Sequence, residues 1–556
     1  MANFLDFVTQ EENVNQQLVP ACENLAAAAL NSHAADRSKI AIVWESVGGE
    51  RQNLTFFEIE RFSNRIANAL QTLGVRREDR VFTVLNRTPE LYAIIPAVIK
   101  LGAAIGVLFP DYGSEAIRQR LKDAGARVLI VNQANLEKIV AVCSELPNLE
   151  QILVVGGNKV EDLCGETIKF HSFEKLVEKA ATEFSAVSVS PDDTCFLIYT
   201  SGTTGLPKGV VHRHQIQERL AATARNVLSL EKTDFYWCTA DPGWVTGLCY
   251  GVFAPWLLGF PILVYEGEFE TNKWLDLLAA HQVTCWYTTP TLLRLLRNEV
   301  GDESPSQKFA LRRIYSAGEP LNPEVIAWAE RVFAAEVFDN YWQTETGTHV
   351  IANRPGVKVR RGSMGKAVEG VQVSIIDSHG REQPNDTVGD IAVRPTLRSL
   401  FKGYWNFPEA TRNCFRAGWY VTRDRGKRDS DGYFWFVARN DDVITCEAQR
   451  IGPFEVENAL LSHPAVAESA AVGAHDPVTT EHVKAFVVLR NEFESSRPLA
   501  EAIARHVRLQ LSPQAAPREI EFIKVLPKTR SGKIQRSQLR KKRQINAQNV
   551  FIISES

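Results

Sequence analysis

Short apolar segments alternate with amphipathic segments over residues 40–157, and this alternation constrains the fold more than any other feature of the sequence. The apolar segments have the length of buried strands, whereas the amphipathic segments carry apolar residues at helical spacing. Such alternation is typical of βα units, which build largely parallel sheets. The sequence therefore predicts an α/β fold. The expected strands are 80–85, 126–131 and 151–156, and the expected helices are 57–73 and 114–124.

A second feature is the glycine- and hydroxyl-rich segment 199–209 (YTSGTTGLPKG), which follows an apolar run. Its glycines let the backbone approach a ligand, so that several N–H groups can surround an anion, and Lys208 adds a positive charge. Pro207 stands where a Walker A loop requires glycine, so the loop is of another kind. We predict a strand, a polyphosphate-binding loop and then a strand or helix start; a plain surface turn is the alternative. The candidate phosphate-binding residues are Thr200, Ser201, Gly202, Thr203, Thr204, Gly205 and Lys208.

Composition excludes several other classes of function. The net charge is −3, which gives no global field that would attract nucleic acid or an anionic membrane. The nine cysteines form no CxxC pair and no ligand cluster, which favours a reducing cytoplasm over a disulfide framework or a zinc site. The N-terminus has no signal-peptide pattern. The most apolar window, 91–109, contains Pro96 and Lys100, so we expect a buried helix and strand rather than a membrane span.

Segment 199–209 resembles the phosphate loop of adenylate-forming enzymes, the superfamily of acyl-CoA synthetases, luciferases and peptide-synthetase adenylation domains. Later motifs keep the order of this superfamily across most of the chain, and AMP-forming acetyl-CoA synthetases of the shorter bacterial type are the most similar. The resemblance implies that ATP and CoA are co-substrates and that magnesium is a cofactor. It also implies a large α/β domain with a β-rich subdomain, here around residues 362–436, followed by a small, mobile α/β domain.

Two further motifs, 316–320 and 337–347, each follow an expected strand and match the nucleotide-binding loops of these enzymes. The resemblance implies that Glu345 and Thr203 bind magnesium and that Thr344 donates to the α-phosphate. A divalent ion and cationic groups are needed there to neutralise the phosphate oxygens. The other nucleotide-binding residues that it implies are Gly318, Glu319, Pro320, Asp339, Asn340, Tyr341, Trp342, Gln343, Asp424, Arg439 and Arg450.

The acyl pocket is expected to involve segment 236–247, which resembles the pocket motif of acetyl-CoA synthetases. Trp342 carries the most information on chain length, because medium-chain relatives tend to have glycine there, and an indole would close the pocket. Ala317 replaces the valine of acetate enzymes, which would leave room for propionate. We therefore expect acetate first and propionate second. The implied pocket residues are Trp244, Val245, Thr246, Ala317 and Trp342.

The domain organisation follows from the same resemblance: a large adenylation domain over 1–438, a hinge over 439–441 centred on Asp441, and a small domain over 442–556. Lys533 follows a glycine and matches the lysine that bridges the carboxylate and the α-phosphate during adenylation. Rotation of the small domain would then withdraw Lys533 and bring segment 447–450 against the CoA channel. The implied channel residues are Glu447, Ala448 and Arg508.

Three positions depart from the pattern, because Arg423, Ala438 and Ala448 replace glycines. Ala448 matters most, since a methyl group there could narrow the CoA channel. Two other functions therefore stay open: an adenylating enzyme that uses another acid or thiol acceptor, and a non-catalytic nucleotide-binding regulator. Lys533 favours catalysis. It is also a candidate target of a lysine acetylase and deacetylase, because acetylation removes its charge.

Overall fold

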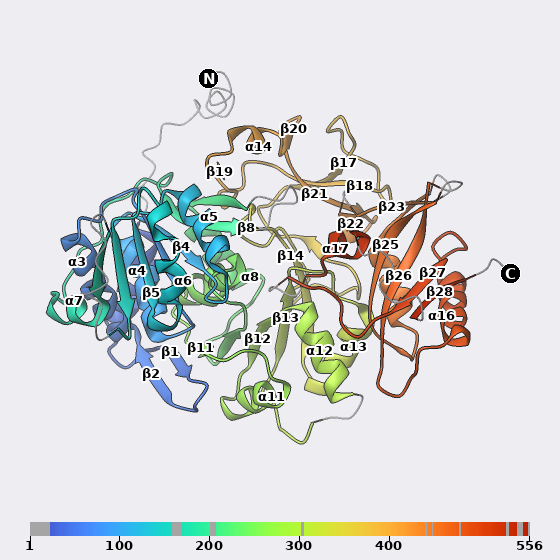
Figure 1. The fold of residues 1–556 in the computed structure, drawn as a ribbon, viewed down its shortest axis with the longest axis horizontal. Helices are drawn as coiled ribbons and strands as arrows, with labels where there is room; N and C mark the ends of the chain where they lie inside the picture. Colours follow the sequence, from blue (N-terminus) through green and yellow to red (C-terminus); the bar gives the residue numbers. More distant parts are fainter. Residues whose placement is uncertain are drawn as a thin grey trace.

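The computed structural model describes residues 23–157, 168–200, 207–301, 305–439, 442–446, 449–476, 480–529, 533–541 and 549–553. Within these ranges the strands form three sheets. Figure 1 shows the eight-stranded sheet at the left, the large sheet at the lower centre and top, and the six-stranded sheet at the right. The helices cover these sheets, and the predicted α/β fold is confirmed.

The eight-stranded sheet contains the βα units that the alternation predicts. Its strands run in the order β19-β9-β8-β4-β3-β5-β6-β7, and the pairs from β8 to β7 are parallel. β8 and β9 form an antiparallel hairpin, so the phosphate-loop candidate connects two adjacent strands. The strands are β3 (Arg80–Val84), β4 (Ala104–Leu108), β5 (Val128–Asn132), β6 (Gln151–Val155), β7 (Lys169–Ser172), β8 (Thr194–Thr200), β9 (Lys208–Arg213) and β19 (Gly403–Tyr404).

The large sheet has a parallel half and an antiparallel half. Its order is β17-β18-β21-β22-β16-β15-β14-β13-β12-β10-β11-β1-β2, with β20 paired to β21. Strands β10 to β14 pair in parallel, so the carboxyl ends of β13 and β14 lie side by side. The strands are β1 (Ile40–Glu45), β2 (Arg51–Thr55), β10 (Tyr236–Cys238), β11 (Ile262–Tyr265), β12 (Cys285–Thr288), β13 (Arg313–Ala317), β14 (Glu336–Tyr341), β15 (Ile351–Ala352), β16 (Gly365–Ala367), β17 (Val373–Ile376), β18 (Gly389–Val393), β20 (Phe415–Arg416), β21 (Trp419–Arg428) and β22 (Tyr433–Arg439).

The six-stranded sheet belongs to the C-terminal part of the chain and has its own buried cluster of Ile, Val, Leu and Ala side chains. The last strand of the large sheet, β22, ends at Arg439, and the next strand already belongs to this smaller sheet. The strands are β23 (Ile444–Cys446), β24 (Gln449–Ile451), β25 (Val466–Asp476), β26 (Thr480–Leu489), β27 (Glu519–Phe522) and β28 (Val550–Ile552).

The helices include both of those expected from the sequence. A capping box between Thr55 and Glu58 begins α3, and Gly125 ends α5 with a left-handed φ of 58°. The window 91–109 forms a buried helix and strand, as expected. No helix in the described ranges is long and apolar enough to cross a bilayer. The helices are α2 (Leu25–Ala34), α3 (Phe56–Thr72), α4 (Pro89–Lys100), α5 (Ser114–Ala124), α6 (Leu136–Val140), α7 (Phe173–Lys179), α8 (Ile216–Asn226), α9 (Val245–Leu248), α10 (Ala254–Leu257), α11 (Thr271–Ala280), α12 (Pro290–Val300), α13 (Pro323–Phe333), α14 (Pro408–Arg412), α15 (Pro453–Leu461), α16 (Arg497–Gln510) and α17 (Arg536–Lys541).

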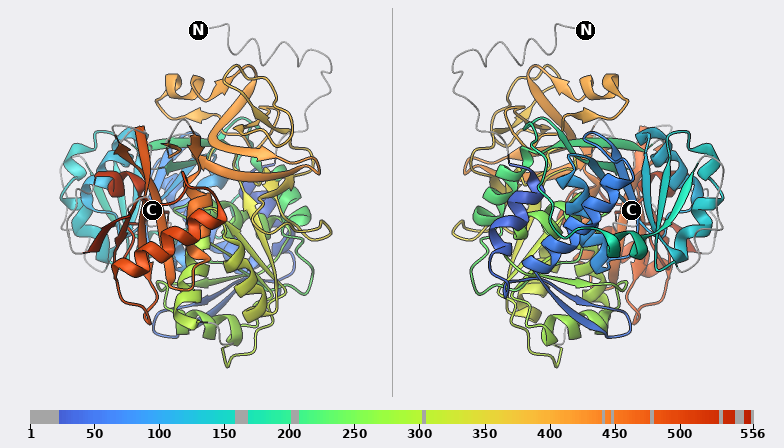
Figure 2. Two further views of the ribbon diagram at one scale, coloured as in Figure 1. Left: turned by 90° about the vertical axis from the view of Figure 1, so that its right-hand side faces the viewer. Right: turned by 90° about the vertical axis from the view of Figure 1, so that its left-hand side faces the viewer.

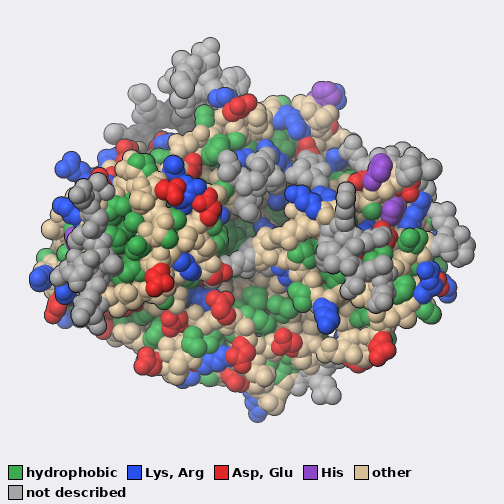
Figure 3. All heavy atoms as spheres, viewed as in Figure 1, with side chains coloured by type: hydrophobic (Ala, Val, Ile, Leu, Met, Phe, Trp, Pro, Cys, Tyr) green, Lys and Arg blue, Asp and Glu red, His purple; other side chains and the backbone are tan. Residues whose placement is uncertain are grey.

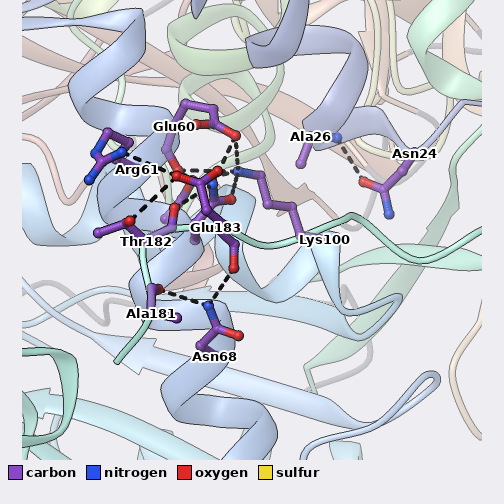
Figure 4. Close-up of polar contacts among 11 residues, drawn as sticks. Asn24, Ala26, Glu60, Arg61, Asn68, Lys100, Ala181, Thr182 and Glu183 are labelled. Atoms are coloured by element: carbon purple, nitrogen blue, oxygen red, sulfur yellow. Dashed lines mark hydrogen bonds and ion pairs between the residues drawn. The ribbon is translucent and has the colours of Figure 1, made fainter. Parts of the chain in front are cut away.

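One lysine is buried in the packing of α4 against α3 (Figure 4). Lys100 is 1% exposed, and its Nζ donates to Ser63 Oγ at 2.9 Å and to Asn64 Oδ1 at 2.6 Å. Glu60 Oε1 lies 3.7 Å from the same nitrogen. Burial lowers the pKa of Lys100 to about 8, although Glu60 opposes the shift.

This lowered pKa predicts a stability gain at alkaline pH. Between about pH 8 and the ordinary lysine pKa of 10.5 the unfolded chain binds more protons at Lys100 than the folded chain does, so raising the pH stabilises the fold. The difference corresponds to about 3 kcal/mol across this window. Urea unfolding of wild type and Lys100→Met should therefore diverge in favour of wild type between pH 8 and 10. Lys122→Met, at an exposed site on α5, is the control, and equal changes in all three proteins would contradict the prediction.

Candidate active site

The ends of β13 and β14 form one wall of the candidate site. Ser316 pairs with Asp339 and Ala317 pairs with Asn340 across these parallel strands. Ser316, Asp339 and Asn340 are at most 5% exposed, yet Ser316 Oγ, Asp339 Oδ1 and Asn340 Oδ1 have no hydrogen-bond partner among the described residues. An unpaired buried acceptor costs about 1–3 kcal/mol. Ser316 and Asp339 lie opposite each other and share one face of the sheet, so their unpaired oxygens fit a ligand that presents N–H groups, such as the amino group of adenine.

Glu319 continues this wall into the loop after β13. Thr291 Oγ1 donates to its carboxylate at 2.8 Å, and Arg294 forms an ion pair with it. Gly318 adopts a φ of +99°, and a Cβ atom there would lie 2.8 Å from the indole of Trp244. Glycine is therefore required at this turn, both for its backbone conformation and for the close approach of Trp244.

A second wall carries Asp424 on β21, which is paired in register with Arg439 on β22. Tyr341 Oη donates to Asp424 Oδ2 at 2.7 Å, and Gln343 Nε2 donates to the same oxygen at 2.6 Å. Arg439 Nε lies 3.6 Å from the other oxygen, Oδ1. Asp424 Oδ1 thus remains the less occupied acceptor, and it can accept hydrogen bonds from ligand hydroxyl groups.

The third wall is made by β9, β19 and the loop after β14. Tyr404 Oη donates to Glu345 Oε1 at 2.6 Å, and Lys208 Nζ lies 5.3 Å from the centre of the Tyr404 ring. His212 Nε2 donates to the Thr344 carbonyl at 2.7 Å. Burial lowers the pKa of His212 to about 4, so the imidazole is neutral when it makes this bond. These contacts fix the backbone of Thr344, which the sequence predicts to bind phosphate. They also fix the carboxylate of Glu345, which the sequence predicts to bind magnesium.

Several predicted residues of this wall can be placed and others cannot. Thr200 and Lys208 face each other in the β8–β9 register. The side chains expected to bind phosphate at 201–205 lie outside the described residues, and Thr203 is among them. A magnesium ion bound mainly by substrate phosphates needs only one or two protein ligands, and the carboxylate of Glu345 is a suitable oxygen donor. No group of three metal-binding side chains occurs within the described ranges.

Lys533 reaches these walls from the C-terminal sheet. Its loop is closed by the Thr529 N–H, which donates to the Lys533 carbonyl at 2.7 Å, and by the Lys533 N–H, which donates to Thr529 Oγ1 at 3.1 Å. The surrounding protein lowers the pKa of Lys533, mainly by desolvation and also through Arg439, while Glu319, Asp424 and Glu345 oppose the shift. The Lys533 side chain is nevertheless exposed, which fits a position at a cleft between the C-terminal unit and these walls. Figure 3 shows a hollow at the centre of this face.

The loop of Lys533 is anchored on its own side of the cleft. Arg536, at the start of α17, forms a two-oxygen ion pair with Glu457 and lies 3.6 Å from Asp442, the first described residue after β22. Asn322, before α13, also donates to Asn458 on α15 across the cleft. The small C-terminal unit is therefore docked on the large one with Lys533 near the predicted nucleotide site.

The expected acyl-pocket residues come together beside β14. Val245, Thr246, Ala317 and Trp342 are at most 7% exposed, and Trp244 packs against the same buried cluster. The ring of Tyr250, from the helical segment after Val245, lies 5.0 Å from Trp342 in an edge-to-face contact. The indole is thus held against the helical turn 249–253, which directly follows the segment 236–247.

The structure describes only part of the CoA-channel candidates. Glu447 and Ala448 lie outside the described residues, as does Asp441 of the expected hinge. Arg450 lies on β24, opposite Thr445, and its side chain is not described. Arg508 is exposed on α16, which Figures 1 and 2 place on the outer side of the small unit, away from β13 and β14.

Sequence reasoning missed Tyr404, His212 and Ser316 as residues that shape the site. Ser316 lies inside the motif 316–320, so the position of that motif could have indicated Ser316 as a site residue. Tyr404 reaches Glu345 only because β19 pairs with β9, with Tyr404 opposite Val210. Nothing in the local sequence around Tyr404 indicates that pairing.

Arg423 occupies a strained position beside Asp424. The β18–β21 register shifts between Asp390/Arg425 and Ala392/Val421, and Arg423 within this irregularity has a φ of +63°. A bulge of this kind can redirect a neighbouring side chain, here Asp424. A residue other than glycine in this conformation costs roughly 1–2 kcal/mol.

We expect Arg423→Gly to stabilise the protein by about 1 kcal/mol, because relief of the strain exceeds the entropy that glycine adds to the unfolded chain. Arg425→Gly, two residues along β21 and without a positive φ, is the matched control and should destabilise by about 0.5–1 kcal/mol. Urea unfolding of both variants checks the prediction. Equal destabilisation by the two substitutions would contradict it.

Comparison with known proteins identifies a protein family for this chain. The model of the AMP-binding enzyme family matches residues 30–405, and that of the AMP-binding enzyme C-terminal domain matches residues 455–533. The chain belongs to the AMP-binding enzyme family. It is 41% identical over 523 residues to an acetyl-coenzyme A synthetase of Bacillus subtilis, with 93% of this chain and 90% of the relative covered.

Other members of the AMP-binding enzyme family are similar over nearly the same length. An acyl-coenzyme A synthetase of Rattus norvegicus, ACSM4, is 36% identical, with 90% of this chain and 86% of the relative covered. The crystal structure of the anthranilate CoA ligase AuaEII with anthranoyl-AMP superposes with a TM-score of 0.87 at 29% identity, and it covers 94% of this chain and 98% of that chain. Similarity therefore extends over both sheet-forming parts of the molecule.

Proposed function

We propose that this protein is an AMP-forming acid–CoA ligase that acts on short carboxylic acids, with acetate preferred and propionate next. It converts the acid and ATP to acyl-AMP and pyrophosphate, and then converts acyl-AMP and CoA to acyl-CoA and AMP. The observation that supports this most is that the exposed Lys533 lies close enough to Glu319, Asp424 and Glu345 for their charges to act on it. The Bacillus relative, named an acetyl-coenzyme A synthetase, supports the same reaction.

The binding steps follow from the three walls. The unpaired oxygens of Ser316 and Asp339 accept hydrogen bonds from the amino group of adenine. Asp424 accepts from the ribose hydroxyls, with Arg439 beside it. The loop after β8, with Lys208, surrounds the phosphates.

In the first step a carboxylate oxygen of the acid attacks the α-phosphorus, a new O–P bond forms, and pyrophosphate leaves with the electrons of the broken bond. Two anions must approach each other, and the positive charge of Lys533 offsets their repulsion. Thr344 donates to the α-phosphate. Glu345, held by Tyr404, would bind magnesium together with Thr203, and the bound ion would neutralise phosphate charge.

In the second step the CoA sulfur attacks the acyl carbon and AMP leaves with the electrons of the C–O bond. We propose the division 1–438, 439–441 and 442–556, with the small domain rotating about Asp441 between the two steps. Segment 447–450, with Glu447, Ala448 and Arg450, would then line the CoA channel, and Arg508 would contact a CoA phosphate. If Ala448 prevents CoA from using this channel, the adenylate would pass to another acceptor.

The acid is selected by the wall that Trp342 forms against Trp244, Val245, Thr246 and Ala317. Each additional methylene in a closed apolar pocket changes binding by about 1–3 kcal/mol. We also propose that the protein works in the cytoplasm, in line with its scattered cysteines. Acetylation of Lys533 by a lysine acetylase, reversed by a deacetylase, would stop the first step by removing the charge.

Separate assays of the two steps test this function. ATP–pyrophosphate exchange with acetate should occur without CoA, and addition of CoA should then release AMP and form acetyl-CoA. Exchange without CoA-dependent AMP release would favour an adenylating enzyme with another acceptor. Nucleotide binding without exchange for any acid would favour a regulator.

A further inference from the structure

The indole of Trp342 is held by a hydrogen bond at its far edge. Its Nε1 donates to Tyr287 Oη at 3.1 Å, and Tyr287 is fully buried on β12. An indole N–H is a donor only, so the Tyr287 oxygen must accept here. A buried N–H without such a partner costs free energy, and this rotamer of Trp342 therefore depends on Tyr287.

The proton of Tyr287 has a defined acceptor as well. His349 Nε2 lies 2.9 Å from Tyr287 Oη, and His349 is fully buried. If Nε2 carried a proton, both it and the tyrosine hydroxyl would be donors, and the hydroxyl proton would have no acceptor. If Nε2 accepts, that proton is satisfied. His349 Nδ1 has no partner among the described residues in either tautomer, so protonation on Nδ1 leaves one unpaired group where protonation on Nε2 leaves two. Burial, which lowers the pKa of His349 to about 3, keeps the imidazole neutral.

The other side of His349 is fixed by Tyr250. The two rings stack with their centres 4.1 Å apart, and the His349 backbone N–H donates to Tyr250 Oη at 3.0 Å. Tyr250 Oη also lies 2.9 Å from Thr223 Oγ1 on α8. Tyr250 contacts Trp342 edge to face as well, so the indole is clamped between a hydrogen bond and a fixed ring.

We infer that Tyr287 and His349 are positioning residues that set the length of acid the enzyme accepts, by holding the Trp342 indole in the conformation that closes the acyl pocket. The inference rests on the proposed function, in which Trp342 forms the end of that pocket. Without an acceptor at Tyr287, the closing conformation loses its advantage over conformations that turn the indole away. Conformations that leave space for a longer acid would then be populated.

The test compares Tyr287→Phe with Tyr315→Phe. Tyr315 is a matched control, since it is equally buried on the neighbouring strand β13 but donates to the Leu228 carbonyl at 2.6 Å. The readout is kcat/KM for acetate, propionate and butyrate. We expect Tyr287→Phe to raise the butyrate-to-acetate ratio about tenfold, which corresponds to about 1.4 kcal/mol, with no change in Tyr315→Phe. An equal ratio in wild type and Tyr287→Phe would overturn the inference.

A second pair of variants tests the route through His349. His349→Gln keeps an acceptor for the Tyr287 proton and should retain the wild-type ratio, whereas His349→Leu removes it and should raise the ratio. In a Trp342→Phe background, which lacks the indole N–H, Tyr287→Phe should have no further effect. A shift that persists there would show that Tyr287 acts by another route.

Failure of the inference and of the proposed function can be told apart. If wild type makes acetyl-CoA and Trp342→Gly changes chain-length preference, but neither Tyr287→Phe nor His349→Leu does, only the inference fails. If Trp342→Gly leaves the preference unchanged, or wild type makes no acyl-CoA, the function proposed for the pocket is wrong.

Discussion

Lys533→Ala should reduce acyl-AMP formation about a thousandfold, while the conversion of supplied acyl-AMP and CoA to the thioester continues. Removal of one group that stabilises charge in a transition state typically costs between about a hundredfold and a thousandfold. Lys533 lies close enough to Glu319, Asp424 and Glu345 for their charges to affect its pKa, which is where the acid and the α-phosphate would meet. ATP–pyrophosphate exchange measures the first step, and acyl-CoA formation from synthetic acetyl-AMP measures the second.

Lys528 provides the control for this experiment. It lies on the same loop but pairs with Glu468 at 2.5 Å, within the small unit. Lys528→Ala should therefore keep both steps within about threefold, because its partner Glu468 belongs to the small unit and to neither the nucleotide site nor the acyl pocket. Equal loss of both steps in Lys533→Ala would contradict the assignment of this lysine to adenylation.

Trp342→Gly should move the preference of the enzyme from acetate to longer acids. Opening of the pocket admits additional methylenes, each of which gains about 1–3 kcal/mol when buried, so the octanoate-to-acetate ratio of kcat/KM should rise about a hundredfold or more. The protein should also lose about 3–5 kcal/mol of stability, since Trp342 is 7% exposed and packs on Tyr250 and His349.

A graded series separates the pocket effect from the stability effect. Trp342→Phe removes less volume than Trp342→Gly, so its preference should shift to intermediate lengths. Initial rates are measured well below the melting temperature of each variant. A loss of activity that is equal for acids of every length would contradict the role of Trp342 in selecting the acid.

Local sequence patterns predict individual helices and strands more reliably than they predict which strands pair with each other. The expected strands 80–85 and 151–156 and the helix 114–124 are confirmed, because burial and helical spacing are local properties of the sequence. The strand expected over 126–131 begins at Val128 instead, since the N–H of Ala126 still bonds to Leu121 at the end of α5. The continuation after the phosphate loop was ambiguous and is a strand paired with β8.

Long motifs indicate candidate site residues, which stay predictions, whereas contacts between distant segments cannot be read from the sequence. Motif similarity indicates Asp424 and Lys533, whose charges interact in the structure. It could not indicate Tyr404, whose contact with Glu345 depends on the pairing of β19 with β9. The resemblance marked Arg423 as a departure, but only the backbone shows the positive φ that makes arginine costly there.

The most direct measurement of the central claim is CoA-dependent AMP release with ATP and magnesium across acetate, propionate, butyrate and octanoate. A short-chain acid–CoA ligase with a closed pocket should release AMP rapidly with acetate and propionate, and should form the corresponding acyl-CoA, with little product from octanoate. Pyrophosphate exchange without CoA-dependent release of AMP for any of these acids would contradict the claim.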